Sequence, residues 1–264
     1  MKKDSFVPRR ISGKVNAFYD KLFEHPGRIF PGLDLDVDIK NLQEFLIGKL
    51  FSGYRSQYNS FLVEFGSGSG GHIIELAKMK PNTLCLGFEI RFKRAVRTIE
   101  KAIKENINNV YIFRGRSELA REILRLPDII IDSEDGIVDE VYINFPDPWE
   151  KKRQRKHRIL SKNLFVVLDS IMRTGGLIAV KTDHKEYFES FLSDLGLLGV
   201  GDKLTGQKKH NFIIEELVHD LHMNIETLNE ISSEARVRTE FEKLFIQQGL
   251  PIFYLKMRAI AKSD

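Results

Sequence analysis

Cysteine is almost absent from this chain of 264 residues: it has one, Cys85, inside an apolar run. A single thiol excludes an intrachain disulfide and a zinc site built from cysteines, and it fits a reducing compartment. Long apolar runs are also missing, since none approaches the ~20 residues that span a bilayer. The basic amino-terminal letters MKKDSFVPRR are followed by no apolar signal core. We therefore expect a cytoplasmic protein without a membrane-spanning segment.

The composition is ordinary for a soluble globular protein, with 42% hydrophobic and 30% charged residues. The length allows one substantial α/β domain with a good core. A net charge of +4 is too small to indicate a partner by itself. Its concentration in residues 151–158 is more informative, because clustered cations suit a polyanion.

From Phe61 onward the apolar pattern alternates between strand and helix periods. Strands are expected at 61–65, 83–90, 109–113, 141–145, 177–182, 212–221 and 250–260. Helices are expected at 71–79, 91–105, 117–126, from an N-cap at Ser161 through Met172 to Gly175-Gly176, and at 184–195. Repeated βα units predict a mostly parallel seven-stranded sheet with helices on both faces, closed by one antiparallel strand. The stretch 128–139 reads mostly as loop.

Residues 1–58 are less regular than the rest of the chain. Arg9, Arg10, Lys14 and Arg28 make the segment basic, and the letters 34–51 hold a candidate helix. We expect residues 1–58 to be a basic extension, packed on or reaching from a main domain of residues 59–264.

The stretch 141–158, VYINFPDPWEKKRQRKHR, joins an apolar strand, a proline-rich turn and a basic run. Phe145 and Asp147 each precede a proline, which favours extended backbone at both. Asp147 is thus a carboxylate on stiffened backbone just past a strand end. Such a carboxylate beside a basic run suggests one site that binds a polyanion and acts on it. The alternative is a surface turn followed by a solvated charge run.

A glycine-rich loop lies between the first strand and the helix at 71–79. Gly66, Gly68 and Gly71 fit the GxGxxG spacing, which lets the backbone approach a ligand at a helix N-terminus. Glu89 ends the next strand, where a carboxylate can accept from ribose hydroxyls. Glu64 would repel the pyrophosphate of NAD but attract the sulfonium and ammonium of S-adenosylmethionine, so we favour the latter. The alternative is a glycine turn without a ligand.

With these motifs in place, the chain from about Phe61 to its carboxyl end resembles the bacterial tRNA (guanine-N7-)-methyltransferase family of the TrmB type. The most specific segments are 144–149 with their basic tail, 181–183 and 239–242; segments 220–222 and 249–252 also resemble the family. The resemblance implies a Rossmann-like class I methyltransferase that transfers methyl from S-adenosylmethionine to N7 of a guanosine in the variable loop of tRNA. It implies no metal, and leaves open a monomer or a homodimer.

The resemblance also implies residue roles, with Asp147 as the catalytic residue. Cofactor contacts are implied for Glu64, Gly66, Gly68, Gly70, Glu89, Arg116, Ser117 and Asp147. Guanosine contacts are implied for Lys151, Asp183, Thr239, Glu240, Phe241 and Glu242. Contacts with the RNA backbone are implied for Lys152, Arg153, Arg155, Lys156 and Arg158.

Two positions depart from the family pattern. Glu150 places a negative charge beside the basic run where the family commonly has a non-acidic residue. Arg116 stands where the family usually carries Asp or Asn for the adenine edge, so Ser117 or a backbone group is expected to replace that contact.

Several other positions have two interpretations. Trp149 could stack on a base or pack inside the protein. His219 and His222 resemble a metal-binding pair only superficially, and we expect both to be structural. Thr239 could simply cap a helix. For the whole chain, an NAD-dependent oxidoreductase on the same fold and a non-catalytic RNA-binding protein are the rival functions.

Overall fold

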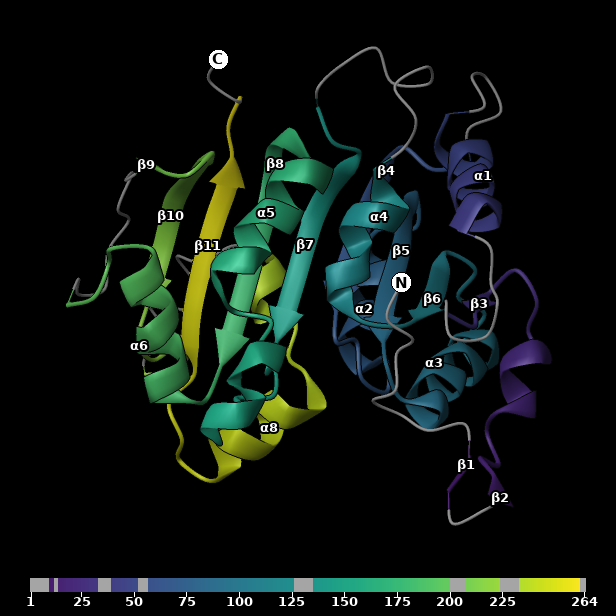
Figure 1. The fold of residues 1–264 in the computed structure, drawn as a ribbon, viewed down its shortest axis with the longest axis horizontal. Helices are drawn as coiled ribbons and strands as arrows, with labels where there is room; N and C mark the ends of the chain where they lie inside the picture. Colours follow the sequence, from purple (N-terminus) through teal and green to yellow (C-terminus); the bar gives the residue numbers. More distant parts are fainter. Residues whose placement is uncertain are drawn as a thin grey trace. The chain divides into compact units, whose positions relative to one another are not determined.

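The computed structural model describes residues 10–11, 14–32, 39–51, 57–125, 135–199, 208–223 and 233–261. The chain divides into two compact units, Met1–Ile130 and Ile131–Asp264. Figure 1 gives the order of the elements along the chain. Among the described residues, no helix has the length and apolar character needed to cross a membrane.

The first unit is built on four parallel strands. In spatial order these are β3 (Ile29–Phe30), β6 (Val110–Arg114), β5 (Thr83–Glu89) and β4 (Ser60–Phe65). β5 and β6 are buried along their whole length, as expected of apolar strands in a parallel sheet covered on both faces. The helices are α1 (Ile39–Leu50), α2 (Gly71–Met79), α3 (Phe92–Lys104) and α4 (Ala120–Leu124). A short 3-10 turn, η4 (Ser117–Leu119), precedes α4.

Part of the basic amino-terminal segment is bonded into this unit. β3 pairs with β6, and Arg28 donates from Nε to Val110 O and from Nη2 to Ile107 O, both at 2.9 Å. The 3-10 turn η1 (Asp20–Phe23) precedes β3, and the two-residue strands β1 (Arg10–Ile11) and β2 (Lys14–Val15) pair with each other. The division at residue 58 between an extension and a main domain stays a prediction.

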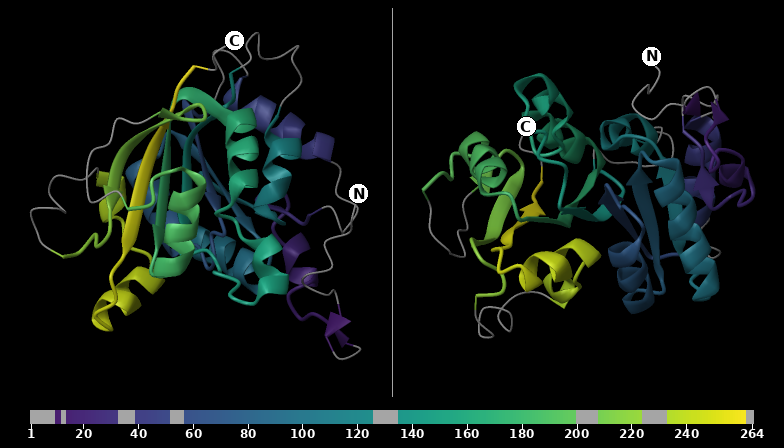
Figure 2. Two further views of the ribbon diagram at one scale, coloured as in Figure 1. Left: turned by 60° about the vertical axis from the view of Figure 1, so that its left-hand side comes forward. Right: turned by 90° about the horizontal axis from the view of Figure 1, so that it is seen from below.

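The second unit holds five strands. In spatial order these are β7 (Val138–Asn144), β8 (Met172–Thr182), β11 (Phe253–Ala259), β10 (Phe212–Val218) and β9 (Lys208–Lys209). β7 and β8 are parallel, and β11 runs antiparallel to both β8 and β10. Helices α5 (Lys162–Ile171) and α6 (Lys185–Asp194) cover one face, and α8 (Glu240–Gln247) lies on the other (Figure 2). The 3-10 turns η5 (Lys152–His157) and η6 (Ser233–Arg236) complete the unit.

All seven expected strands are present, and the antiparallel β11 is confirmed. Two further strands, β3 and β9, pair with β6 and β10, so the expected count of seven is too low. Each has only two residues, too few to give a hydrophobic period in the sequence. β9 is also antiparallel to β10, so among the described strands β11 is not the single antiparallel strand that had been expected.

The segment after α5 differs from expectation. The helix was expected to run through Met172 to the glycine pair, but it ends at Ile171 and β8 begins at Met172. The cause is pairing with β7: Met172 lies opposite Val138, and Arg173 forms an ion pair with Asp139 at 2.7 Å. Ser161 occupies the N-cap position without a capping hydrogen bond from its side chain.

Smaller differences concern boundaries. The expected helix at 117–126 is divided into η4 and α4. β7 begins at Val138, inside the stretch read as loop, while residues 126–134 lie outside the described part of the chain. Helix α1 confirms the helix expected within residues 34–51. Residues 34–38 of that range also lie outside the described part of the chain.

Candidate active site

The glycine-rich loop of the first unit takes a left-handed backbone at three positions. Gly66, Gly68 and Gly70 have φ of 75°, 59° and 80°, a region that residues with a Cβ enter at a cost. The loop is fixed to β5, because the N–H groups of Gly66 and Ser67 donate to Phe88 O at 2.9 and 3.0 Å. The GxGxxG pattern therefore marks a tight turn between β4 and α2.

Close packing adds a second requirement for glycine in this loop. A Cβ on Gly70 would lie 2.4 Å from Thr98 Cγ2 on α3. A Cβ on Gly87 of β5 would lie 2.6 Å from Ser67 Oγ, so the loop rests directly on the strand. Within the described residues, Ser67 Oγ is buried and has no hydrogen-bond partner. Gly68, in contrast, faces open space, with Gly66 O at 4.0 Å as the nearest atom to an added Cβ.

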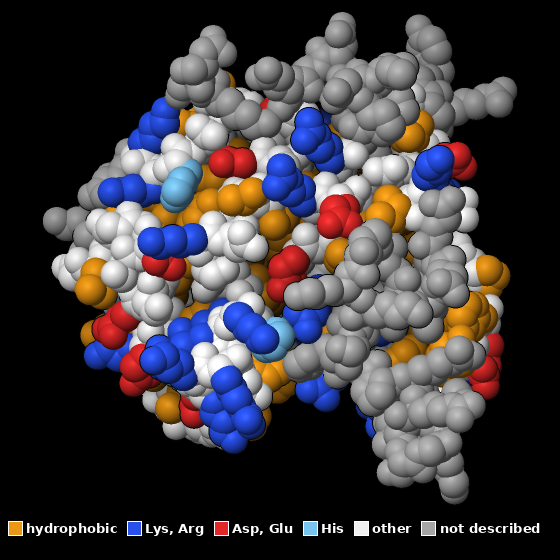
Figure 3. Space-filling model, in the orientation of Figure 1, with side chains coloured by type: hydrophobic (Ala, Val, Ile, Leu, Met, Phe, Trp, Pro, Cys, Tyr) orange, Lys and Arg blue, Asp and Glu red, His pale blue; other side chains and the backbone are white. Residues whose placement is uncertain are grey.

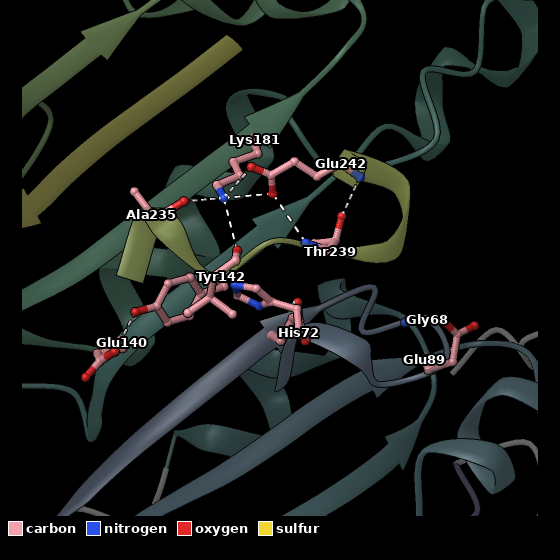
Figure 4. A network of polar contacts seen from close by, with 11 residues as sticks. Gly68, His72, Glu89, Glu140, Tyr142, Lys181, Ala235, Thr239 and Glu242 are labelled. Carbon is pink, nitrogen blue, oxygen red and sulfur yellow. Dashed lines mark hydrogen bonds and ion pairs between the residues drawn. The ribbon is translucent and has the colours of Figure 1, made fainter. Parts of the chain in front are cut away.

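Glu89 closes the glycine loop with its carboxylate. Oε2 accepts from the Gly68 N–H at 2.9 Å; Figure 4 labels both residues. Oε1 accepts from the Arg91 N–H at 2.7 Å. Burial raises the pKa of this carboxyl above its ordinary value, and the two backbone donors partly offset that rise. Each oxygen has a second acceptor site. The carboxylate can therefore hold the loop and still accept from a ribose.

Glu64 is buried and has a partner that the sequence did not suggest. His72 Nδ1 lies 2.9 Å from Glu64 Oε1, so the two buried side chains are joined by a hydrogen bond. His72 is the second residue of α2 and is also buried. Its position directly after the glycine loop was the only available signal in the sequence.

Two more of the residues expected to bind the cofactor follow β6. Ser117 is buried at the start of η4, and Arg116 Nη1 lies 3.9 Å from Glu118 Oε1. Together with Glu64, the glycines and Glu89, these positions fall at the carboxyl ends of β4, β5 and β6. Ligands of open parallel sheets bind at that edge.

In the second unit, the turn around Asp147 has an unexpected backbone. Phe145 and Trp149 have positive φ, 48° and 44°, so the expected extended conformation at Phe145 is wrong. The reason is tertiary: the Phe145 N–H donates to Lys181 O at 2.8 Å, and its ring lies 5.4 Å from that of Phe245. These contacts offset a backbone cost of about 1–2 kcal/mol per left-handed residue. Asp147 itself is exposed.

The basic run forms η5 and is mostly solvent-facing. The exposed members are Lys151, Lys152, Arg153, Arg155 and Lys156. Figure 3 shows Lys and Arg side chains gathered at the bottom of the view, where Figure 1 shows the segment that follows β7. Trp149 is half-buried, with its ring 5.6 Å from that of His157.

Arg158 differs from the other cations of this run. It is half-buried, its Nε donates to Pro148 O at 2.6 Å, and its guanidinium lies 4.6 Å from the centre of the Tyr187 ring. The run is therefore attached at both ends to the turn that carries Asp147.

Lys181, at the end of β8, is the centre of a buried polar cluster. Its Nζ donates to Glu242 Oε2 at 2.9 Å and to Ala235 O at 2.6 Å (Figure 4). His222 Nε2 lies 2.8 Å from Glu242 Oε1. Thr239 and Glu242 form a capping box at the start of α8, which confirms the interpretation of Thr239 as a helix cap.

This cluster bears on the role expected for Glu242. The side chain is 0% exposed, and its oxygens accept from Lys181, His222 and the Thr239 N–H. Burial would raise its pKa, yet the His222 hydrogen bond and the Lys181 charge outweigh burial and hold the pKa below its ordinary value. Direct contact with guanine stays a prediction; the geometry favours a role in fixing α8.

Asp183 and Phe241 remain more accessible. Asp183 follows β8 and is half-buried, and burial raises the pKa of its carboxyl. Phe241 is 47% exposed and stacks on Phe245, with ring centres 6.2 Å apart. Glu240 is exposed beside it. Among the described residues, no group of three or more His, Cys, Asp or Glu is arranged to hold a metal ion.

Comparison with known proteins places the chain in a family. Residues 58–255 match the family Methyltransf_4, described as "Putative methyltransferase". The tRNA (guanine-N(7)-)-methyltransferase of Limosilactobacillus reuteri is 32% identical over 73% of this chain and 78% of its own length. The chain belongs to the tRNA (guanine-N7-)-methyltransferase family. The oxidoreductase interpretation is therefore wrong.

This member of the methyltransferase family is also similar to a larger bifunctional enzyme and to a solved methyltransferase structure. A bifunctional glycosyltransferase/methyltransferase of Fusobacterium nucleatum is 33% identical over 93% of the chain, which spans 33% of that protein's length. The crystal structure of the antibiotic-resistance methyltransferase Kmr has a TM-score of 0.50 at 15% identity, covering 84% of this chain and 94% of Kmr. The latter likeness shows the class I methyltransferase fold.

Proposed function

We propose that this chain transfers a methyl group from S-adenosylmethionine to N7 of a guanosine in the variable loop of tRNA, in the cytoplasm. Residues 59–264 would form the methyltransferase domain. The observation that carries the proposal is the continuous segment from Asn144 to Arg158. It presents an exposed carboxylate on a braced turn and leads directly into an exposed basic run.

Methyl transfer to guanine N7 needs no strong general base. Guanine N7 has a free lone pair, so no proton must leave before the methyl is transferred. The remaining tasks are in-line placement of the reacting atoms and support for the cationic product. Asp147 is suited to both, because its exposed carboxylate can orient the base and stabilise positive charge on it.

The residues of the first unit fit S-adenosylmethionine, which supplies an activated methyl on sulfur. Glu89 has acceptor sites left for ribose hydroxyls, and Glu64 supplies negative charge that suits a cationic ligand. The glycine loop brings backbone close to the ligand, and Ser67 Oγ is a buried hydroxyl in that loop. Arg116 carries no acceptor, so Ser117 or a backbone group would meet the adenine edge.

Recognition of the guanosine would rest chiefly on Asp183 and Lys151. A carboxylate such as Asp183 can accept from the guanine N1–H and exocyclic amine. N7 lies on the major-groove edge, which proteins read poorly in A-form RNA, so an accessible loop base is the natural substrate. Exposed Lys152, Arg153, Arg155 and Lys156 would contact phosphates and set the register of the RNA.

The decisive experiment is incubation of the purified protein with labelled S-adenosylmethionine and unmodified tRNA, followed by mapping of the labelled nucleoside. We expect the label on guanine N7 in the variable loop. Label on another nucleoside, or no transfer, would overturn the proposal. Binding of tRNA without turnover would support the rival function, a non-catalytic RNA-binding protein.

A further inference from the structure

Arg158 stands out from the cations that precede it. Lys152, Arg153, Arg155 and Lys156 are exposed, whereas Arg158 is half-buried and directed back at the turn. Its place in the sequence suggested another phosphate contact, but its bonds in the structure are to protein groups.

The contacts of Arg158 form a defined clamp. Nε donates to Pro148 O at 2.6 Å, a short charge-assisted hydrogen bond. The guanidinium carbon lies 4.6 Å from the centre of the Tyr187 ring, within the range of a cation–π contact. Tyr187 is fully buried, and its hydroxyl accepts from the Leu160 N–H at 2.8 Å. The arginine is thus held by groups on both sides of it.

The clamp acts on the backbone next to Asp147. Pro148 lies between Asp147 and Trp149, and Trp149 has a left-handed backbone that must be held by its surroundings. Burial raises the pKa of the Tyr187 phenol above its ordinary value, and the hydrogen bond from Leu160 and the positive charge of Arg158 partly offset that rise.

We propose that Arg158 is a positioning residue: it holds the Pro148 carbonyl, and so fixes the Asp147 carboxylate for methyl transfer. The bond from Arg158 to Pro148 closes the segment Pro148–Arg158 into a loop. The proposed phosphate contacts of η5 and the placement of Asp147 then depend on the same segment, which the Arg158–Pro148 hydrogen bond holds in place. This inference rests on the proposed function, which assigns Asp147 to the reaction.

The main test compares Arg158→Lys with Arg155→Ala in single-turnover methylation at saturating tRNA and cofactor. Lysine keeps the positive charge but not the planar fork that binds Pro148 O while covering Tyr187. We expect Arg158→Lys to slow the saturated rate roughly 10- to 100-fold while the salt dependence of tRNA binding stays near that of wild type. Arg155→Ala should instead lower the slope of log K against log[salt] by about one.

A second readout needs no activity. Trp149 is the one tryptophan in the sequence, and it follows Pro148 directly, so its fluorescence reports on the turn. We expect Arg158→Lys and Arg158→Ala to shift its emission and increase its quenching by acrylamide. Arg173→Lys is the matched control: Arg173 pairs with Asp139 at the opposite end of β8, so Trp149 emission should not change.

The outcomes separate this inference from the proposed function. If wild-type protein does not methylate guanine N7, the proposed function fails, while Trp149 fluorescence still tests the clamp. If Arg158→Lys retains the wild-type saturated rate and Trp149 emission, Arg158 is not a positioning residue. A lowered salt slope in Arg158→Ala, with a normal saturated rate in both variants, would show that Arg158 is only a phosphate contact. Should Arg158→Ala fail to fold by circular dichroism, Arg158→Lys decides.

Discussion

The glycine loop of the first unit and the Pro146–Pro148 turn of the second both need left-handed backbone, and they obtain it differently. In the loop, Gly66, Gly68 and Gly70 adopt positive φ without steric cost. In the turn, Phe145 and Trp149 adopt it against the preference of residues with a Cβ. Glycine makes the first conformation local, whereas tertiary contacts impose the second.

The two regions also hold their carboxylates differently. Glu89 is buried and accepts from two backbone N–H groups, so it serves the loop before any ligand arrives. Asp147 is exposed, and the turn around it is braced by Lys181 O on one side and Arg158 on the other. The conformation of the turn therefore depends on residues outside it. We expect substitutions elsewhere in the sequence to disturb the turn more than they disturb the glycine loop.

The largest expected effect comes from removing the positive charge of Lys181, whose backbone carbonyl also holds the turn around Asp147. Lys181→Met leaves the Glu242 carboxylate buried without its cation, and we expect a loss of about 3–5 kcal/mol in the free energy of unfolding. Urea denaturation measures it. The double variant Lys181→Met with Glu242→Leu should recover part of the loss, because a buried ion pair can be replaced by apolar groups. Unchanged stability in the single variant would contradict the cluster's role.

Next in size is the charge on the turn itself. Asp147→Asn keeps the size of the side chain and removes its charge, so tRNA binding should stay nearly normal while turnover falls. We expect a rate loss of ~10²–10³, or about 2.7–4 kcal/mol. Single-turnover methylation under saturating conditions isolates this step from binding. A rate within about threefold of wild type, under ~1 kcal/mol, would make Asp147 a structural turn residue.

The corresponding change on the loop side is Glu89→Ala. It removes the acceptor for the Gly68 and Arg91 N–H groups as well as the expected ribose contact. We expect the affinity for S-adenosylmethionine to weaken by about 1.5–3 kcal/mol. Titration calorimetry provides the measurement. Wild-type affinity in this variant would refute the ribose assignment.

A matched pair of alanine substitutions then sharpens the account of the loop. Gly70→Ala and Gly68→Ala both place a Cβ on left-handed backbone, but only the Cβ at residue 70 meets Thr98, at 2.4 Å. We expect Gly70→Ala to be the more destabilising by roughly 1–3 kcal/mol, the cost of overpacking. Thermal and urea unfolding of both variants give the difference. Equal stability would show that the loop moves away from α3 without cost.

The smallest expected effect is the pH dependence of folding stability, which has opposite directions for Glu242 and Glu89. The pKa of Glu242 is lowered below its ordinary 4.5, so its ionised form stabilises the fold above that pH, and the contribution is lost as pH falls. The pKa of Glu89 is raised above 4.5, so its contribution is lost as pH rises. The stability gap between wild type and Glu242→Gln should narrow toward acid, and that for Glu89→Gln toward neutral pH. Urea unfolding across the acid range measures both gaps, and the same trend in both would be inconsistent with these shifts.

Local chemistry explains which parts of the fold were predictable. The helix over 71–79 and the central strands follow from hydrophobic period and glycine punctuation, and the structure confirms them. The two-residue strands and the early start of β8 did not follow, because each exists through pairing with another strand. Helix and strand periods inside one segment carry no information about such partners.

In the candidate site, too, some features follow from local sequence and others from contacts between distant residues. The sequence by itself determined the glycine loop, the carboxylates at strand ends, the Asp147 turn and the basic run, because each is a short pattern with its own chemistry. Tertiary structure decided that Phe145 is left-handed, that Glu242 is buried against Lys181, 61 residues away, and that Arg158 faces the turn instead of solvent. Hydrogen bonds and ring contacts between distant residues outweigh local preference at these positions, and no local pattern records them.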